Sequence, residues 1–139
     1  GCLAIYVPER GALFATDTVM GISTTVLRPG EGNLRDYVST LELCQRIGPK
    51  TIYSGHGGPI TDPARRLNHL ARHREQREQD LLRVLEQGTH TVGEIREKMY
   101  EGLAEVRWEL AEAQLRTGIN KLIDDGAARA EGDRYTATP

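Results

Sequence analysis

The sequence predicts an α/β protein followed by a smaller α+β tail, and three observations support this class. Short apolar and β-branched runs near the start are separated by a segment whose apolar residues have helical spacing. A long helical segment follows, with an N-cap and a proline at its first position, and after Gly88 the pattern is helix, helix, hairpin. With 139 residues, the chain fits one ordinary domain or two small ones.

Three runs near the start predict extended segments. Residues 2–7 (CLAIYV) are continuously apolar, which is typical of a strand buried on both faces. Residues 8–11 (PERG) predict a turn, and residues 12–15 (ALFA) predict a second strand. The β-branched residues 24–27 (TTVL) predict a further extended segment. Strands buried on both faces need covering layers, so we expect helices to pack against them.

Two helices are predicted on either side of a short strand. Residues 33–47 carry an apolar stripe with an N-cap at the start and the pair Gly48-Pro49 as the stop. Residues 51–53 (TIY) predict the strand, which leads into the glycine-rich loop SGHGGP. Asp62 as N-cap, with proline at the next position, predicts a helix that continues to about residue 87.

The second of these helices is unusually polar. Residues 72–80 include no aliphatic side chain, so this stretch is either solvated or packed against polar partners. Residues 63–88 carry six basic and four acidic side chains. The arginines either clamp an anionic substrate or form an arginine and glutamate ladder along a solvated helix.

The tail predicts a helix, a longer helix and a hairpin. Residues 91–94 (TVGE) are a capping box that opens the first helix. Residues 106–125 keep helical spacing and are followed by Gly126, where a C-terminal glycine belongs. Residues 127–136 predict a small hairpin. Helix, helix, hairpin is the element order of a winged-helix module.

Two residues at predicted strand ends are the candidates for chemistry. Asp17 follows the second strand, where a carboxylate either caps the next turn or ligates a metal. His56 lies between glycines after the 51–53 strand, where it is either a ligand facing a shared cleft or an ordinary loop histidine. A sheet brings such loops together, and a carboxylate and an imidazole are hard-cation and zinc-type ligands.

The stretch LFATDTVMG at residues 13–21, followed by YSGHG at residues 53–57, resembles the second half of metallo-β-lactamase superfamily hydrolases. The resemblance continues through HREQRE at residues 73–78 and the tail, which are similar to the lactamase-β-like subgroup with a C-terminal winged helix. The resemblance to this family extends over essentially the whole chain.

The resemblance implies both an architecture and a role for the two candidates. It implies the C-terminal half of an αββα sandwich at residues 1–62, a connecting helix at residues 63–88 and a winged-helix-like domain at residues 89–139. It implies two divalent metal ions, zinc by preference, that activate a hydroxide for hydrolysis of an ester, a thioester or a phosphodiester. In this family Asp17 would bridge the two ions, and His56 would be the last histidine ligand, bound to the second ion.

The chain departs from the family pattern in two places. The His-x-His-x-Asp-His ligands are absent, and Thr16 stands where the family commonly has glycine beside the aspartate. Because a catalytic zinc site needs about three protein ligands, we expect this chain to be inactive alone. His69 and His73 have a chelating spacing, but arginines surround them, which favours solvated or structural histidines. His90 is expected at the surface.

The net charge and the composition of the chain bear on whether it binds DNA or spans a membrane, and on its location. The net charge is −2, and residues 89–139 hold seven basic and ten acidic side chains, which disfavours duplex DNA as a partner. No run of 18 apolar residues is present, so a membrane span is excluded. Cys2 and Cys44 form no disulfide framework and no signal peptide precedes them, so the expected location is cytoplasmic.

The substrate and the assembly stay open at this point. The resemblance allows a small-molecule ester or thioester, or single-stranded RNA. The chain opens with Gly1 rather than methionine, so we expect it to be cut from a longer protein. Only two helices are available to cover the strands before Asp62, so one face or edge should stay open and associate. A rival hypothesis is therefore a non-catalytic interaction module that pairs with a missing N-terminal half or with a second copy of itself.

Overall fold

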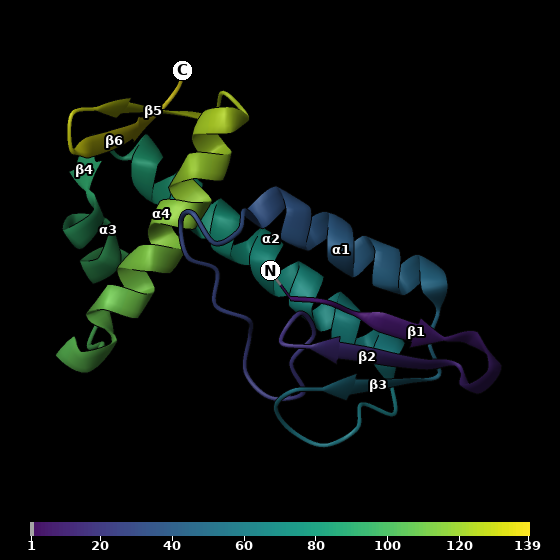
Figure 1. The fold of residues 1–139 in the computed structure, drawn as a ribbon. Helices are drawn as coiled ribbons and strands as arrows, with labels where there is room; N and C mark the ends of the chain where they lie inside the picture. Colours follow the sequence, from purple (N-terminus) through teal and green to yellow (C-terminus); the bar gives the residue numbers. More distant parts are fainter. Residues whose placement is uncertain (1) are drawn as a thin grey trace. The chain divides into compact units, whose positions relative to one another are not determined.

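The computed structural model describes residues 2–139 and contains two small sheets and four α-helices within that range (Figure 1). The first elements in chain order are β1 (Ile5–Val7), β2 (Ala12–Thr16), α1 (Leu34–Ile47), β3 (Thr51–Ser54) and α2 (Pro63–Glu86). The remaining elements are β4 (His90–Thr91), α3 (Val92–Met99), α4 (Trp108–Asp124), β5 (Ala128–Glu131) and β6 (Arg134–Ala137).

The described chain divides into two compact units. The first unit comprises the residues up to Thr25 together with Arg35–Arg74, and the second comprises Val26–Leu34 together with Glu75–Pro139. Gly1, with which the first expected domain begins, lies outside the described residues. The three domains expected from the sequence, at residues 1–62, 63–88 and 89–139, stay a prediction.

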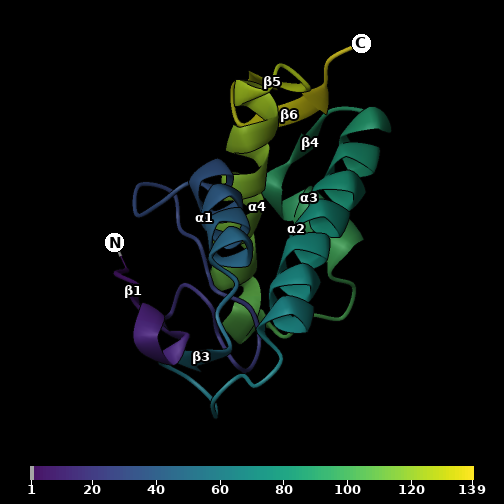
Figure 2. The same cartoon turned by 90° about the vertical axis from the view of Figure 1, so that its right-hand side faces the viewer.

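The first unit is built on a sheet of order β1-β2-β3. β1 and β2 are antiparallel, whereas β2 and β3 are parallel neighbours, with α1 between them in the chain. Figures 1 and 2 show α1 and the first half of α2 on the same side of this sheet. The fully buried side chains on that side are aliphatic and come from both strands and helices: Leu13, Leu41, Ile52, Leu67 and Leu70.

The expectation that residues 2–7 form a strand buried on both faces is wrong. Only Ile5–Val7 is a strand, and it lies at the edge of the sheet. Ile5 is 56% exposed, and on the two other strands Phe14 and Tyr53 are 46% and 40% exposed. Because the unit's two helices cover one side only, the other face of the sheet is open, as the count of covering helices predicted. We call Ile5, Phe14 and Tyr53 the open face.

Residues 24–27, expected to be extended, pair with no strand of the described residues, and Thr25 instead contacts a loop and α2. Its hydroxyl donates to the carbonyl of Asp17 at 2.6 Å, and its carbonyl accepts from the buried guanidinium of Arg74. That guanidinium lies 5.1 Å from the centre of the Tyr37 ring. The polar middle of α2 therefore packs against polar partners at Arg74.

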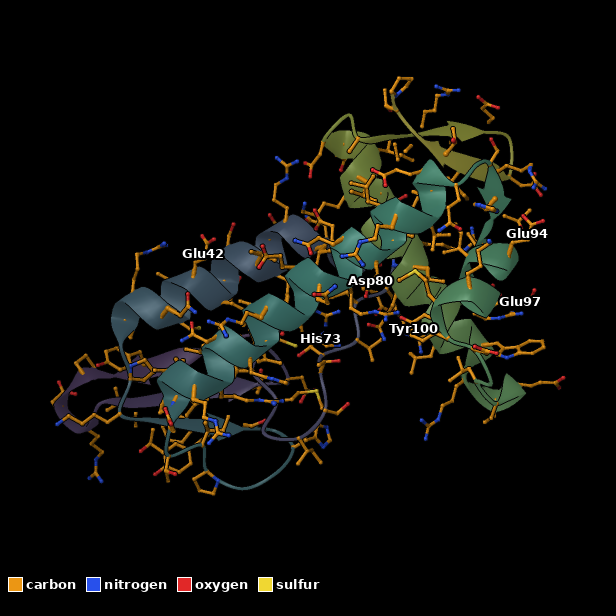
Figure 3. All side chains as sticks on the ribbon, turned by 180° about the vertical axis from the view of Figure 1, so that it is seen from behind. Glu42, His73, Asp80, Glu94, Glu97 and Tyr100 are labelled. Carbon is orange, nitrogen blue, oxygen red and sulfur yellow. The ribbon has the colours of Figure 1, made fainter. Side chains whose placement is uncertain are left out.

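Farther along α2, charged side chains pair with one another. Arg83 lies 2.8 Å from Asp80, and Arg77 lies 3.9 Å from the same carboxylate. Asp80 projects from the outer side of the helix, as Figure 3 shows. Arg77 also stacks over the Tyr100 ring at 4.4 Å from its centre. The arginines here pair with an aspartate rather than with the glutamates of the expected ladder, and the side chains of Arg77 and Asp80 are each only 30% exposed.

The second unit places α3 and α4 beside a sheet of order β4-β6-β5. The capping box is present, since Glu94 N donates to the Thr91 hydroxyl at 3.3 Å and Thr91 N donates to the Glu94 carboxylate at 2.7 Å. The predicted hairpin is β5 and β6. The short β4 was not predicted. The core is aliphatic and includes Leu85, Ile95 and Ile119, each fully buried.

Among the helices of residues 2–139, none combines the length and the apolar character that a bilayer crossing requires.

Candidate metal site at the ends of β2 and β3

The two residues expected to carry chemistry lie side by side at one edge of the first sheet. β2 and β3 are parallel neighbours, so their carboxyl ends meet at the same edge. Asp17 directly follows β2, and His56 lies two residues after β3. His56 Nε2 and Asp17 Oδ1 are 3.6 Å apart. The sequence spacing alone did not require this meeting, because the two strand ends, Thr16 and Ser54, are 38 positions apart and the whole of α1 lies between them.

The hydroxyl of Ser54 joins the two loops that carry this pair. Ser54 Oγ accepts a hydrogen bond from Gly21 N at 3.1 Å and another from His56 N at 3.1 Å. Gly21 N also donates to the carbonyl of His56 at 3.0 Å. Gly55 N donates to the carbonyl of Thr16 at 2.9 Å. The loop after β2 and the loop after β3 are thus held together by backbone groups on both sides of the ligand pair.

Two glycines make this close approach possible. A Cβ added to Gly55 would lie 2.6 Å from Asp17 Oδ1, which is inside van der Waals contact. A Cβ added to Gly21 would lie 3.0 Å from the carbonyl oxygen of His56. Any side chain at Gly55 would therefore displace the Asp17 carboxylate directly.

Thr16 adopts the backbone conformation that its place in the family pattern predicts for glycine. Its φ angle is 45°, in the left-handed region that β-branched residues rarely occupy. The pairing of β2 with β3 shifts register between Phe14 and Thr16. The Thr16 hydroxyl donates to the carbonyl of Leu3 at 3.1 Å. The register shift lies directly before Asp17, and Thr16 adopts a left-handed backbone conformation there although it is not glycine.

The ligand pair suits a divalent metal in donor type and spacing. A separation of 3.6 Å is too long for a hydrogen bond. Two ligands that each lie about 2.1 Å from one ion at the tetrahedral angle are about 3.4 Å apart. Both side chains are accessible, with 61% of His56 and 51% of Asp17 exposed. The separation and the accessibility of these two atoms are therefore compatible with a shared ion.

The site is incomplete in the described residues. Within residues 2–139, no group of three or more histidine, cysteine, aspartate or glutamate side chains is positioned to hold a metal ion. His69 is exposed on α2 and His73 is half-buried, and neither belongs to such a group. His90, expected at the surface, is instead half-buried in β4, where it pairs with Tyr135 of β6. Its burial follows from a strand that sequence reasoning did not find.

Sequence reasoning missed two residues that shape the site. Ser54 is one, and its position directly before Gly-His-Gly was the available clue. The other is Arg66 of α2, whose Nε donates to the carbonyl of Met20 at 2.8 Å. No local pattern indicated that contact, because the two residues are 46 positions apart.

Comparisons with known proteins place this geometry in context. No family model matches the chain. A protein of Drosophila melanogaster named beta-lactamase-like protein 2 homolog is 29% identical over 124 residues, which are 87% of this chain and 41% of that protein. An atrochrysone carboxyl ACP thioesterase of Aspergillus fumigatus is 31% identical over 78 residues, which are 56% of this chain and 24% of that protein.

Among solved structures, a metallo-beta-lactamase family protein of Thermus thermophilus is similar over almost the whole chain. Its TM-score is 0.83 at 26% sequence identity, covering 97% of this chain and 44% of that protein. The chain thus spans less than half of the length of these relatives. The part of their fold that it matches is mixed α/β, as the sequence predicted.

Proposed function

Because the chain belongs to the metallo-β-lactamase superfamily, a superfamily of hydrolases, we propose that it forms part of a metal-dependent hydrolase of acyl esters or thioesters. The observation that carries this proposal is the pairing of Asp17 with His56 at the ends of two parallel strands, with 3.6 Å between Oδ1 and Nε2. The name of the thioesterase relative supports a thioester as the substrate class.

Asp17 and His56 hold the divalent metal in this proposal, and zinc fits their oxygen and nitrogen donors. The chemistry that such an ion supplies is Lewis acidity and activation of water near neutral pH. Asp17 contributes negative charge, and His56 contributes a neutral nitrogen ligand. The hydrogen bonds of Ser54 hold together the two loops that carry these residues.

The remaining ligands come from outside the chain, since about three are needed and this chain provides two. The open face supports a second half that packs on it. Phe14 and Tyr53 stack there with ring centres 5.0 Å apart and an interplanar angle of 16°. With Ile5 they form an apolar surface on a sheet, which is typical of a buried interface. An N-terminal half of the same protein is the proposed occupant, and a second copy of the chain is the alternative outcome.

The proposal also covers the C-terminal tail and the cellular location of the protein. We assign to residues 89–139 a winged-helix-like domain that packs on the hydrolase domain or lines a substrate cleft, because the net acidic charge of these residues opposes binding to duplex DNA. Both cysteines are free thiols, Cys2 exposed and Cys44 buried, which supports a reducing, cytoplasmic location.

Metal content and hydrolysis of the full-length protein test the function. Wild type should contain at least one equivalent of zinc, manganese or iron, and the Asp17→Ala and His56→Ala variants should lose metal and hydrolysis together. Asp124→Ala is the matched control, because Asp124 is an exposed carboxylate of α4 outside the site. Metal content that the two site variants leave unchanged would refute the assignment. A metal-free and inert wild type would favour the interaction module.

Substrate class is resolved by parallel assays with an acyl thioester, the matching oxygen ester and a single-stranded RNA oligonucleotide. The proposal expects the fastest metal-dependent turnover with the thioester. Turnover of RNA alone would overturn the acyl assignment while leaving the metal site intact.

A further inference from the structure

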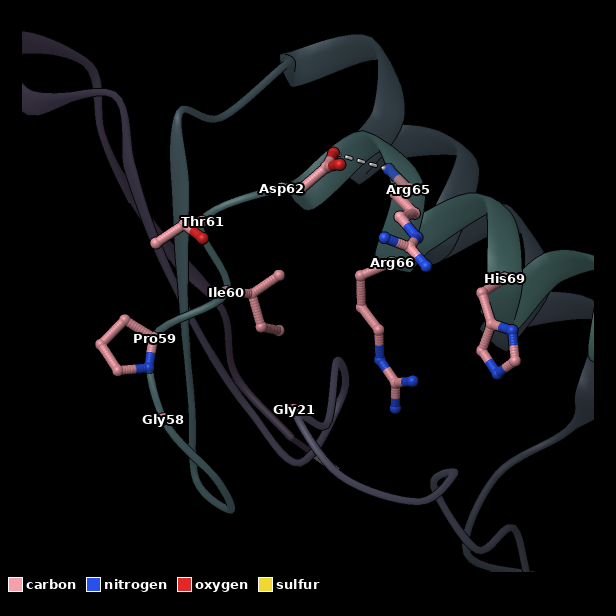
Figure 4. A pocket seen from close by; sticks show the side chains of 9 residues that line it. All are labelled: Gly21, Gly58, Pro59, Ile60, Thr61, Asp62, Arg65, Arg66 and His69. Atoms are coloured by element: carbon pink, nitrogen blue, oxygen red, sulfur yellow. Dashed lines mark hydrogen bonds between the residues drawn. The ribbon is translucent and has the colours of Figure 1, made fainter.

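A pocket lies next to the ligand pair, within the first unit. Its volume is about 540 Å³, and it is bounded by residues 58–62, the first turns of α2 and Gly21 (Figure 4). Gly21 N donates to the carbonyl of His56 at 3.0 Å, and Gly58 follows His56 by two positions. The pocket therefore adjoins the loop that carries the histidine of the proposed metal site.

Three basic side chains of α2 line this pocket: Arg65, Arg66 and His69. None of the three forms an ion pair with a residue that the structure describes. This distinguishes them from Arg83 on the same helix, which lies 2.8 Å from Asp80. Cationic side chains that line a pocket without a carboxylate partner are available to an anion from solution.

One of these arginines is fixed in position by the backbone of the preceding loop. Arg66 Nε donates to the carbonyl of Met20 at 2.8 Å, and its Nη2 donates to the carbonyl of Ser23. Carbonyl oxygens orient a guanidinium without neutralising its charge. Figure 4 shows the Arg66 and His69 side chains extending from α2 in the same direction.

The charge inside the pocket is positive. Asp62 alone is acidic among the lining residues, and its Oδ1 accepts a hydrogen bond from Arg65 N at 3.1 Å as the helix cap. Two guanidinium groups against one carboxylate leave one net positive charge, without counting His69.

We propose that this pocket binds an oxyanion of the substrate, a phosphate or a carboxylate, that is not part of the bond that is cleaved. Planar guanidinium groups bind both oxyanions through paired hydrogen bonds, and the Arg65 guanidinium has its donors unused in the described structure. The inference rests on the proposed function, since it gives that site its preference for an acidic acyl ester or thioester.

Substrate discrimination in the full-length protein tests the pocket. Three thioesters are compared that share the acyl group and end in a phosphate, a carboxylate or a neutral amide. Arg65→Gln should reduce kcat/KM for the anionic substrates relative to the neutral one by about tenfold, which corresponds to about 1.4 kcal/mol. Arg72→Gln is the matched control, because Arg72 is exposed on the same helix outside the pocket. The phosphate and carboxylate arms distinguish the two oxyanions.

Binding of inorganic phosphate provides a readout that does not depend on hydrolysis. Phosphate should shift the NMR signals of residues 58–62 and the His69 ring, and Arg65→Gln should weaken this binding while Arg72→Gln should not. If Arg65→Gln and Arg72→Gln discriminate equally between anionic and neutral thioesters and bind phosphate equally, the oxyanion-binding role of the pocket is refuted, even if hydrolysis is intact. Arg65-dependent phosphate binding in a protein that hydrolyses nothing would support the pocket and overturn the proposed function.

Discussion

Truncation of Phe14 tests whether another layer covers the open face in the full-length protein. In the described structure Phe14 is 46% exposed, and its main contact on that face is the stacked ring of Tyr53 at 5.0 Å. An aromatic pair of this kind contributes about 0.5–1.5 kcal/mol beyond area burial. A fully covered phenylalanine costs about 3–5 kcal/mol when it is replaced by alanine. Because we propose that an N-terminal half packs there, we expect Phe14→Ala to lower the free energy of unfolding by about 3–5 kcal/mol.

The assay is equilibrium unfolding in urea of wild type, Phe14→Ala and Leu13→Ala. Leu13 calibrates the comparison, because it points to the opposite side of the same strand and is 2% exposed. Its replacement by alanine should cost about 2–5 kcal/mol whether or not the open face is covered. A loss below about 1.5 kcal/mol for Phe14→Ala, beside a full loss for Leu13→Ala, would refute the covering layer.

Three further predictions concern the cap of α3 and the ligand pair. Thr91→Ala should lower the free energy of unfolding by about 1 kcal/mol, because α3 loses its N-cap; thermal unfolding measures this. The hydrogen bond from the backbone of Thr91 lowers the pKa of Glu94 below its usual 4.5, and the positive charge of Arg134 lowers it further. Because the pKa of Glu94 is lower in the folded state than in the unfolded state, the ionised carboxylate stabilises the fold at pH values above its usual pKa. This stabilisation is lost as the pH falls through the folded-state pKa. Glu94→Gln should therefore reduce the melting temperature at pH 7 and converge with wild type in acid. Gly55→Ala should weaken metal binding about 10–100-fold, since its Cβ would meet Asp17 Oδ1 at 2.6 Å. Gly32→Ala, whose added Cβ meets nothing within 4 Å, is the control in a metal titration; unchanged metal affinity in Gly55→Ala would contradict the proposed contact.

The helices followed from local chemistry, so the sequence predicted them well. Asp62 caps α2 through its carboxylate, and Pro63 is the first helical residue, as the sequence indicated. The capping box at Thr91 is likewise formed within four residues. Interactions of this range are independent of the rest of the fold, and the sequence contains all the partners.

Burial of the strands did not follow from local chemistry. The run at residues 2–7 is apolar, but what covers a strand depends on elements elsewhere in the chain, and the described helices cover one side. The contact of Arg74 with Thr25 joins residues 49 positions apart, which no periodicity in the sequence reveals. β4 is two residues long and is defined only by its pairing with β6.

The candidate pair was predictable as residue types at strand ends, and the resemblance gave it a role. Its separation was not predictable, because that depends on the parallel register of β2 with β3 and on the bulge at Thr16. Whether the two side chains bind metal stays a prediction.

The hydroxyl of Ser54 has a consequence for how the ligand pair meets an ion. It accepts from the amides of both Gly21 and His56, so a single side chain joins the backbones of the two loops that carry the carboxylate and the imidazole. In the proposed metal site, binding of an ion would require no refolding of either loop, because these hydrogen bonds already hold the loops together. The serine at the end of β3 thus fixes how closely the two loops approach each other.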